Sequence, residues 1–113
     1  MKLRDDRVFL HHILDAIQQI EEYSTGIAGE AFQTNRLVQD GVVRELEIIG
    51  EASRNLSDEF RDHHPEIPWS AIVGMRNRIT HAYFDLDLEA IWDAVKQDLP
   101  VLKAQVEAIL ASL

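Results

Sequence analysis

The sequence predicts an all-α fold, an up-and-down bundle of four to five helices. Apolar residues recur with the 3.6-residue period of an amphipathic helix over three long stretches. The chain of 113 residues contains only 3 prolines and 5 glycines, and runs of β-branched residues are few. The connections between the periodic stretches are short, and the chain has no repeat or linker. We therefore expect residues 1–113 to form a single domain.

The first helix is predicted over residues 5–24. Asp5 and Asp6 fall at its amino end, where carboxylates interact favourably with the helix dipole. Residues 25–30 contain two glycines and are predicted to form a turn. The inward face of the helix carries apolar residues at i, i+4, i+7, i+8 and i+11, namely Phe9, Ile13, Ala16, Ile17 and Ile20.

The second helix is predicted over residues 32–56. Gly41 and Gly50 lie inside it, and each lowers helix propensity by about 1 kcal/mol relative to alanine. We therefore expect another helix to approach closely at both glycines. The apolar stripe of this helix consists of Val38, Val42, Leu46, Ile49, Ala52 and Leu56.

A short third helix is predicted after Ser57, a good N-cap residue, and it should end near His63. Pro68 then takes the first position of a fourth helix, where proline is favoured. We expect this helix to pack through Trp69 and to continue to about Phe84.

Residues 85–87 are predicted to form a turn that ends in an N-cap, and the last helix should cover residues 88–112. Pro100 lies inside that helix and should kink it. The inward side chains are Ile91, Val95, Leu99, Leu102, Val106, Ile109 and Leu110.

The charge balance limits the classes of partner. The formal net charge is −9, which repels phosphates and argues against a broad nucleic-acid-binding surface. A small local cleft remains compatible, because 8 of the 11 basic residues are arginines. The absence of cysteine excludes disulfides and cysteine-ligated metals. We find no apolar run long enough for a membrane span and no signal-peptide core, so we expect a cytoplasmic protein without membrane contact.

Residues 76–83, which read RNRITHAY, carry the candidate chemistry. On the predicted helix Asn77 and His81 share one edge, while Arg76, Thr80 and Tyr83 share the adjoining edge. A phosphate-binding cation beside a group that titrates near neutral pH could cleave a phosphodiester without a metal. The alternative is a solvated helix face.

Spacing alone does not decide between these readings. Arg7 with His12, and Arg4 with His11, show similar separations on the first helix. In a chain of this composition about one such match is expected by chance. We interpret those two pairs as surface charge, because neither has a neighbouring asparagine and tyrosine.

The surroundings of the motif match a known family in order and spacing. Characteristic segments are residues 46–52, 67–69, 74–77 and 81–84, followed by Asp87, Ile91-Trp92 and Asp98-Leu99-Pro100. Through these segments the chain resembles the HepT-like toxins, a branch of the HEPN superfamily of all-helical RNA-cleaving domains. The resemblance covers nearly the whole chain.

The resemblance implies an endoribonuclease in which the 2′-hydroxyl of RNA attacks the adjacent phosphate, without a metal or another cofactor. Arg76 would bind the scissile phosphate, His81 would transfer protons, and Asn77 would orient phosphate or ribose. Two further residues are candidates for support. Glu51 could pair with Arg76 or Arg54, and Thr80 lies on the same predicted edge as Arg76.

A homodimer is also expected. One motif histidine cannot serve as base and acid in the same step, whereas a two-fold interface would bring two copies of Arg76 and His81 across one cleft. Domains of this family are generally dimeric, which agrees with that expectation.

Tyr83 is expected to be a modification site. HepT-like toxins pair with a minimal nucleotidyltransferase (MNT-type) antitoxin that transfers AMP to this tyrosine; the alternative is a tyrosine that only packs at a helix end. The RNA substrate is open between tRNA and mRNA. Two other functions also remain open: a non-catalytic partner that binds and positions the nucleotidyltransferase, and a bare dimerisation module.

Other polar residues are interpreted as structural or solvated. The adjacent pairs His11-His12 and His63-His64 are poor chelates, so no metal site is expected there. Trp69 and Trp92 are interpreted as packing anchors. Three arginines could extend an RNA path, although solvation of each is the favoured interpretation: Arg36, Arg44 and Arg78.

Overall fold

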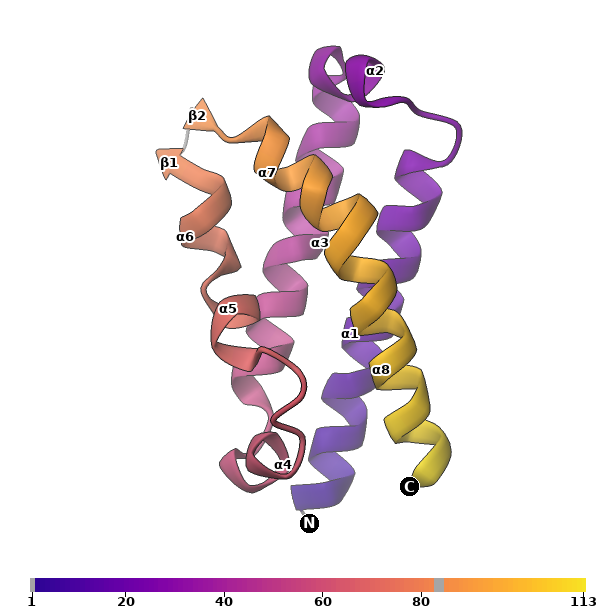
Figure 1. Ribbon diagram of the computed structural model, residues 1–113, viewed down its shortest axis with the longest axis vertical. Coiled ribbons are helices and arrows are strands. Elements are labelled where there is room, and N and C mark those ends of the chain that lie inside the picture. The colour runs from indigo at the N-terminus through magenta and orange to yellow at the C-terminus, as the bar shows by residue number, and fades with distance from the viewer. Residues whose placement is uncertain (1, 83–84) are drawn as a thin grey trace.

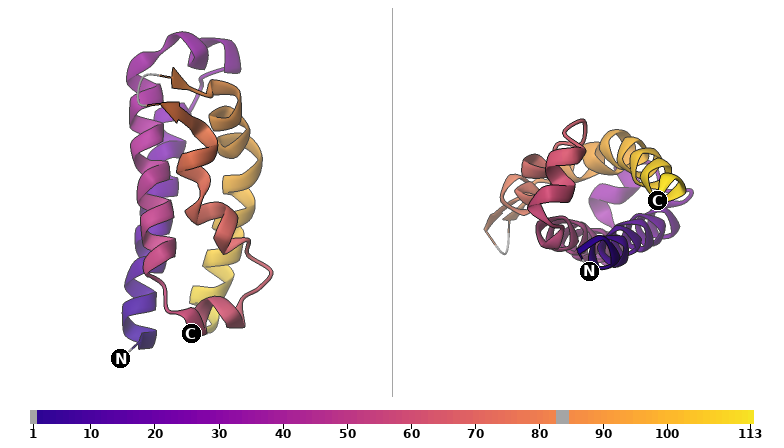
Figure 2. Two further views of the ribbon diagram at one scale, coloured as in Figure 1. Left: turned by 90° about the vertical axis from the view of Figure 1, so that its left-hand side faces the viewer. Right: turned by 90° about the horizontal axis from the view of Figure 1, so that it is seen from below.

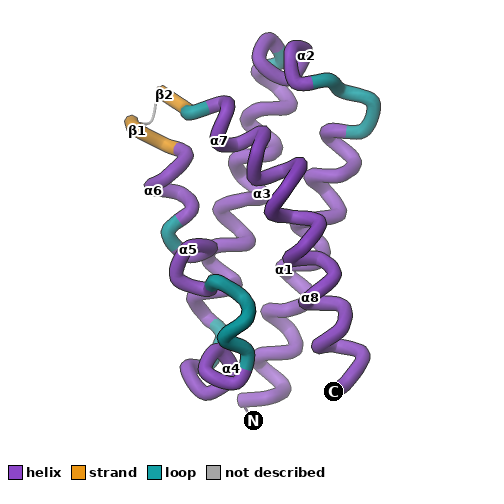
Figure 3. Tube along the Cα trace, viewed as in Figure 1, coloured by secondary structure: helices purple, strands orange, loops and turns teal. Residues whose placement is uncertain are grey.

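The computed structural model describes residues 2–82 and 85–113 as a helical bundle with one small hairpin (Figures 1 and 3). Its long helical segments are α1 (Lys2–Ser24), α3 (Arg36–Asn55) and a C-terminal run of α7 (Leu88–Asp93), the π-helical turn η1 (Ala94–Asp98) and α8 (Leu99–Ser112). Shorter elements are α2 (Gly29–Thr34), α4 (Asp58–His63), α5 (Trp69–Val73), α6 (Met75–Ile79), β1 (Thr80–Ala82) and β2 (Asp85–Leu86). The predicted all-α bundle is confirmed.

The bundle encloses one apolar core. Helices α1 and α3 run antiparallel, α8 packs on α1, and α5 packs on α3 (Figure 1). Viewed from below, the helices surround a common centre (Figure 2). The predicted stripes fill that centre, including the fully buried residues Ile13, Ile17, Ile20, Val42, Leu46, Ile49, Ile91 and Val106. Among the described residues, no helix has both the length and the apolar character needed to cross a membrane.

The predicted second helix is interrupted at its start. Asn35 has φ −107° and ψ 89°, and its side-chain oxygen accepts a hydrogen bond from the Val38 N–H at 3.1 Å. An asparagine that caps the helix in this way cannot also lie in its interior. Residues 29–34 therefore form the separate helix α2, which brings the buried Phe32 against the Trp92 ring, with 4.8 Å between the ring centroids.

The two glycines of α3 mark close helix contacts, as the sequence predicted. A Cβ atom at Gly41 would lie 3.0 Å from the Tyr23 ring of α1. A Cβ atom at Gly50 would lie 3.4 Å from the Ile72 carbonyl oxygen of α5. Glycine at these positions lets α1 and α5 approach α3 more closely than a larger residue would.

Pro100 is accommodated by a π-helical turn. Residues 94–98 form η1, and Pro100 lies in the first turn of α8 directly after it. Proline has no N–H to donate and clashes with the carbonyl four residues earlier in an α-helix. The wider π turn changes the hydrogen-bonding pattern of the helix just before the proline. The helix then continues to Ser112.

A buried carboxylate joins the amino end of α1 to the start of α4. Ser57 is the N-cap of α4, because its hydroxyl accepts from the Phe60 N–H at 3.1 Å. Asp6 is only 3% exposed, and its carboxylate accepts hydrogen bonds from both the N–H and the hydroxyl of Ser57, each at 2.7 Å. Asp6 therefore makes a tertiary contact in addition to its predicted place at the helix end.

We predict that Asp6→Ala destabilises the fold by about 2 kcal/mol, because it leaves the Ser57 N–H without its charged acceptor. Chemical denaturation measures the free energy of unfolding. Asp5→Ala is the matched control, since it removes an exposed carboxylate from the same helical turn. Equal stability of the two variants would show that the Asp6 contact contributes nothing.

Candidate active site

The motif segment is divided by a break at Gly74. Helix α5 ends at Val73, and Gly74 is its C-cap with φ −82° and ψ 0°. The Gly74 N–H makes the last helical hydrogen bond of α5, to the Ser70 carbonyl at 3.0 Å. A new helix, α6, then begins at Met75, and the Asn77 N–H donates to the Gly74 carbonyl at 3.0 Å. The buried side chains of Ile72 and Met75 hold the two helices against the core.

The prediction of one motif helix reaching Phe84 is wrong: α6 ends at Ile79. The Ile79 carbonyl oxygen accepts from the Asp87 N–H at 2.9 Å, so it is engaged by a residue beyond the hairpin. The chain instead forms β1 and β2, which pair antiparallel with Thr80 opposite Leu86. β-Branched residues at the end of α6 and the start of β1 favour this change from helix to strand.

This break changes the geometry expected for the motif. Arg76 and Asn77 lie on α6, whereas Thr80 and His81 lie on β1. Asn77 and His81 therefore do not share one edge of a helix, and Thr80 does not continue the edge of Arg76. The side chain of Asn77 is exposed. Tyr83, the predicted modification site, lies outside the described residues.

Asp87 fixes the chain on the far side of the hairpin. Besides its backbone hydrogen bond to Ile79, its carboxylate accepts from the Ala90 N–H at 3.0 Å and caps α7. The predicted N-cap is thus confirmed. The same residue ends the motif helix and begins the C-terminal one, which places the hairpin at the upper end of the bundle (Figure 1).

A groove lies beside the hairpin along α3. It measures about 470 Å³ and brings β2 together with the outer face of α3; its lining residues are Asp40, Val43, Arg44, Glu47, Ile48, Glu51 and Leu86. Glu51, predicted as a supporting residue, therefore lies in the same groove as the strand that pairs with β1. Sequence analysis did not single out Glu47, although its i, i+4 relation to Glu51 places both on one helix face.

Glu51 is a fixed negative charge in this groove. Its Oε1 atom accepts from Arg54 Nη2 at 2.6 Å, which is one of the two pairings that the sequence suggested. The hydrogen bond from Arg54 lowers the pKa of the Glu51 carboxyl below its ordinary value. A carboxyl group that stays ionised to lower pH is unsuited to proton transfer near neutrality.

Two of the three candidate path arginines form ion pairs. Arg36 pairs with Asp40 at 3.3 Å, and Arg78 pairs with Asp98 at 3.6 Å. Arg44 is exposed and lines the groove along α3. The pairing of Arg78 with Asp98 joins α6 to the end of η1, and no periodicity or spacing in the sequence predicts it.

The remaining polar candidates have structural contacts. His63 Nδ1 lies 2.7 Å from the Glu59 carbonyl oxygen, and His64 lies 3.4 Å from Glu66. Across residues 2–82 and 85–113, no group of three or more His, Cys, Asp or Glu is arranged to hold a metal ion. Both tryptophans are packing residues as predicted: Trp69 is 7% exposed, and Trp92 packs on Phe32.

Comparison with known proteins gives one consistent family. The model of a family described as "Ribonuclease HepT-like" matches residues 13–109. A protein of Thermococcus cleftensis named "Probable ribonuclease HepT" is 42% identical over 106 residues, covering 94% of this chain and 96% of the relative. A protein of Methanocaldococcus jannaschii named "Putative RNase" is 39% identical over 109 residues, covering 96% of this chain and all of the relative.

A third relative, from Caldanaerobacter subterraneus and also named "Putative RNase", is 39% identical over 108 residues and covers 96% of each chain. No solved structure matches the chain significantly. The family match spans the core helices, the α5–α6 break and the hairpin, and the relatives align over nearly their full lengths. These matches show that the chain belongs to the HepT-like ribonuclease family.

Proposed function

We propose that this chain is a metal-independent endoribonuclease in which Arg76 and His81 carry the chemistry. The observation that carries the proposal is an intact motif, Arg76-Asn77 on α6 and His81 on β1, inside a chain of the HepT-like ribonuclease family. Helix α6 and strand β1 are adjacent in the sequence, so the backbone brings the guanidinium-bearing and imidazole-bearing residues to one end of the bundle.

The proposed reaction is internal transesterification. The 2′-oxygen of one ribose loses its proton and bonds to the neighbouring phosphorus, and the bond from phosphorus to the 5′-oxygen breaks. The products carry a 2′,3′-cyclic phosphate and a 5′-hydroxyl. Arg76 would stabilise the charge that grows on the phosphoryl oxygens. His81 would transfer a proton, since the reference pKa of histidine, about 6.5, suits either direction. Asn77, which cannot ionise, would orient the substrate.

We predict that the purified protein cleaves RNA in EDTA and that His81→Ala lowers the rate by about 10²- to 10⁴-fold, the usual contribution of a positioned acid or base. End-labelled tRNA and mRNA are the substrates, and the product ends are tested for cyclic phosphate. His11→Ala is the matched control, because it removes an exposed histidine on α1.

Equal activity of the two histidine variants would contradict the role of His81. A native protein that carries no modification and cleaves neither RNA would favour the other candidate, a non-catalytic protein that binds and positions a nucleotidyltransferase.

The active form is proposed to be a homodimer with a composite site. One motif histidine per chain cannot act as base and acid in one step, and a two-fold axis near the hairpin would supply a second His81 and a second Arg76. Pairing would also concentrate arginines in a chain whose net charge is −9. The α3 groove beside the hairpin is lined by three carboxylates and one arginine, namely Asp40, Glu47, Glu51 and Arg44. Carboxylates therefore predominate in its lining and oppose the approach of phosphates.

We predict that a mixed dimer of one native and one His81→Ala subunit loses far more than half of its activity. Differently tagged subunits are purified as mixed dimers, and cleavage is measured per dimer. Two independent sites would retain half of the activity, and that result would contradict the shared site. Native mixed dimers that carry both tags control for the effect of tagging.

The proposed partner is an MNT-type nucleotidyltransferase antitoxin that transfers AMP from ATP to the Tyr83 hydroxyl. The phenolic oxygen bonds to the α-phosphorus, and pyrophosphate leaves. The attached phosphate would add negative charge two residues after His81, and its charge and bulk would both oppose binding of the RNA backbone. This reaction would make the chain the toxin of a toxin–antitoxin pair.

We predict that co-expression with such a nucleotidyltransferase adds the mass of one adenylyl group (AMP less water) to the native chain and abolishes RNA cleavage. Tyr83→Phe should stay unmodified, because it lacks the hydroxyl that accepts AMP. Tyr23→Phe is the control, since Tyr23 lies on α1. Intact mass spectrometry reads the modification, and AMP found on another residue would contradict the assignment.

A further inference from the structure

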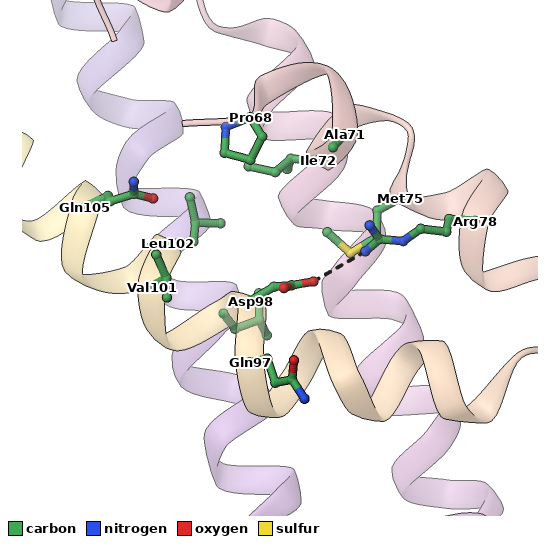
Figure 4. Close-up of a pocket in the computed structure, with 11 residues that line it drawn as sticks. Pro68, Ala71, Ile72, Met75, Arg78, Gln97, Asp98, Val101, Leu102 and Gln105 are labelled. Carbon is green, nitrogen blue, oxygen red and sulfur yellow. Dashed lines mark ion pairs between the residues drawn. The ribbon is translucent and has the colours of Figure 1, made fainter. Parts of the chain in front are cut away.

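A second groove separates the motif helix from the C-terminal helix. It lies between α5–α6 on one side and η1–α8 on the other and measures about 250 Å³ (Figure 4). Its apolar lining includes Ile72, Met75, Leu99 and Leu102, which are nearly buried. Helix α6 therefore does not pack tightly along the C-terminal run at this place.

One ion pair crosses this groove. Arg78 Nη2, from α6, lies 3.6 Å from Asp98 Oδ2 at the end of η1. Figure 4 shows the two side chains meeting in front of Met75, so the pair bridges the groove at its α6 end. Both side chains are about half exposed, at 50% and 60%, and water screens their attraction. The pair should therefore contribute little to global stability.

The two ends of the bridge differ in how firmly they are held. Asp98 belongs to a long continuous helix and lies between the buried residues Val95 and Leu99. Helix α6 has only five residues, too few to be stable alone, and it follows the break at Gly74. Its position depends on the burial of Met75 and Ile79 and on its ties to other elements.

Those ties restrain α6 unequally. The hydrogen bond from Asp87 to the Ile79 carbonyl fixes the carboxyl end of the helix. Burial of Met75 and Ile79 fixes its depth, but a groove remains open on the side of the C-terminal helix. The bridge from Arg78 limits movement on that open side. Arg78 is two residues after Arg76 and directly follows Asn77, so a shift of Arg78 moves the backbone of both.

We propose that Asp98 is a positioning residue, which acts through Arg78 to hold α6 and its motif residues at the correct distance from the C-terminal helix. This inference rests on the proposed ribonuclease function. Catalysis depends on geometry far more steeply than stability does, since a displacement of about 1 Å can cost about 100-fold in rate. A weak surface ion pair can therefore matter for turnover and hardly at all for folding.

A different role for Arg78 would be direct contact with RNA. In that case Asp98 would compete with phosphate for the guanidinium, and loss of the Asp98 charge would strengthen RNA binding. The positioning role predicts instead that turnover falls when either Arg78 or Asp98 is changed. Charge reversal separates the two, because an aspartate at position 78 can re-form the bridge but cannot bind phosphate.

The test measures kcat and KM for RNA cleavage together with the thermal midpoint. Asp98→Asn and Arg78→Gln should each lower kcat by about 10- to 100-fold, with KM and the midpoint little changed. The double variant Arg78→Asp/Asp98→Arg should recover most of the lost kcat. Asp93→Asn is the matched control, since it removes an exposed carboxylate from α7, five residues earlier in the same helical run.

Several outcomes would overturn the proposal. An unchanged kcat in Asp98→Asn would do so. A lower KM in that variant would also do so, because it would show that Arg78 binds RNA directly. A lower thermal midpoint that fully accounts for the lost activity would reduce the bridge to a stability contact. Failure of the native protein to cleave RNA would instead refute the proposed function itself, and the two failures are therefore distinguishable.

Discussion

The hydrogen bond between the Asp87 N–H and the Ile79 carbonyl oxygen is the constraint on which the rest of the motif region depends. In a continuing helix that carbonyl would accept from the amide four residues later. Its engagement by Asp87 ends α6, closes the β1–β2 hairpin and starts α7, whose first turn the Asp87 carboxylate caps. One residue thereby joins the five-residue helix that carries Arg76 and Asn77 to the long C-terminal helical run.

The long helices were predictable because burial repeats along them. The predicted stripes of α1 and α3 lie in the core from Ile13 and from Val42 onward, while their first members, Phe9 and Val38, are partly buried against it. The glycines of α3 mark close contacts. Interruptions were harder to predict. From the sequence, Asn35 could lie inside a helix or cap one. The packing of Phe32 on Trp92, which favours the cap, is a tertiary contact that the local sequence does not show. The hairpin depends on a contact between residues 79 and 87, which no helical periodicity encodes.

In the candidate site, too, some features follow from the sequence and others depend on tertiary contacts. The proposed chemistry of Arg76, Asn77 and His81 rests on the residue types of the motif and on the family resemblance, because those properties belong to side chains and to their order along the chain. Their predicted arrangement on two adjoining edges of a single helix was wrong, because α6 stops at Ile79. The pairing of Glu51 with Arg54 follows from an i, i+3 spacing. The bridge from Arg78 to Asp98 spans separate elements, and only the folded structure reveals it.

The contact between Asp6 and Ser57 links positions 51 residues apart and makes the lower end of the bundle one cooperative unit. If the first turns of α1 fray, Asp6 withdraws and α4 loses the residue that orients its cap. Short helices ordinarily open on their own in local fluctuations. Here the amide protons at the start of α4 should exchange with solvent together with those of the first turns of α1, so that the opening of a six-residue helix is coupled to the end of a much longer one.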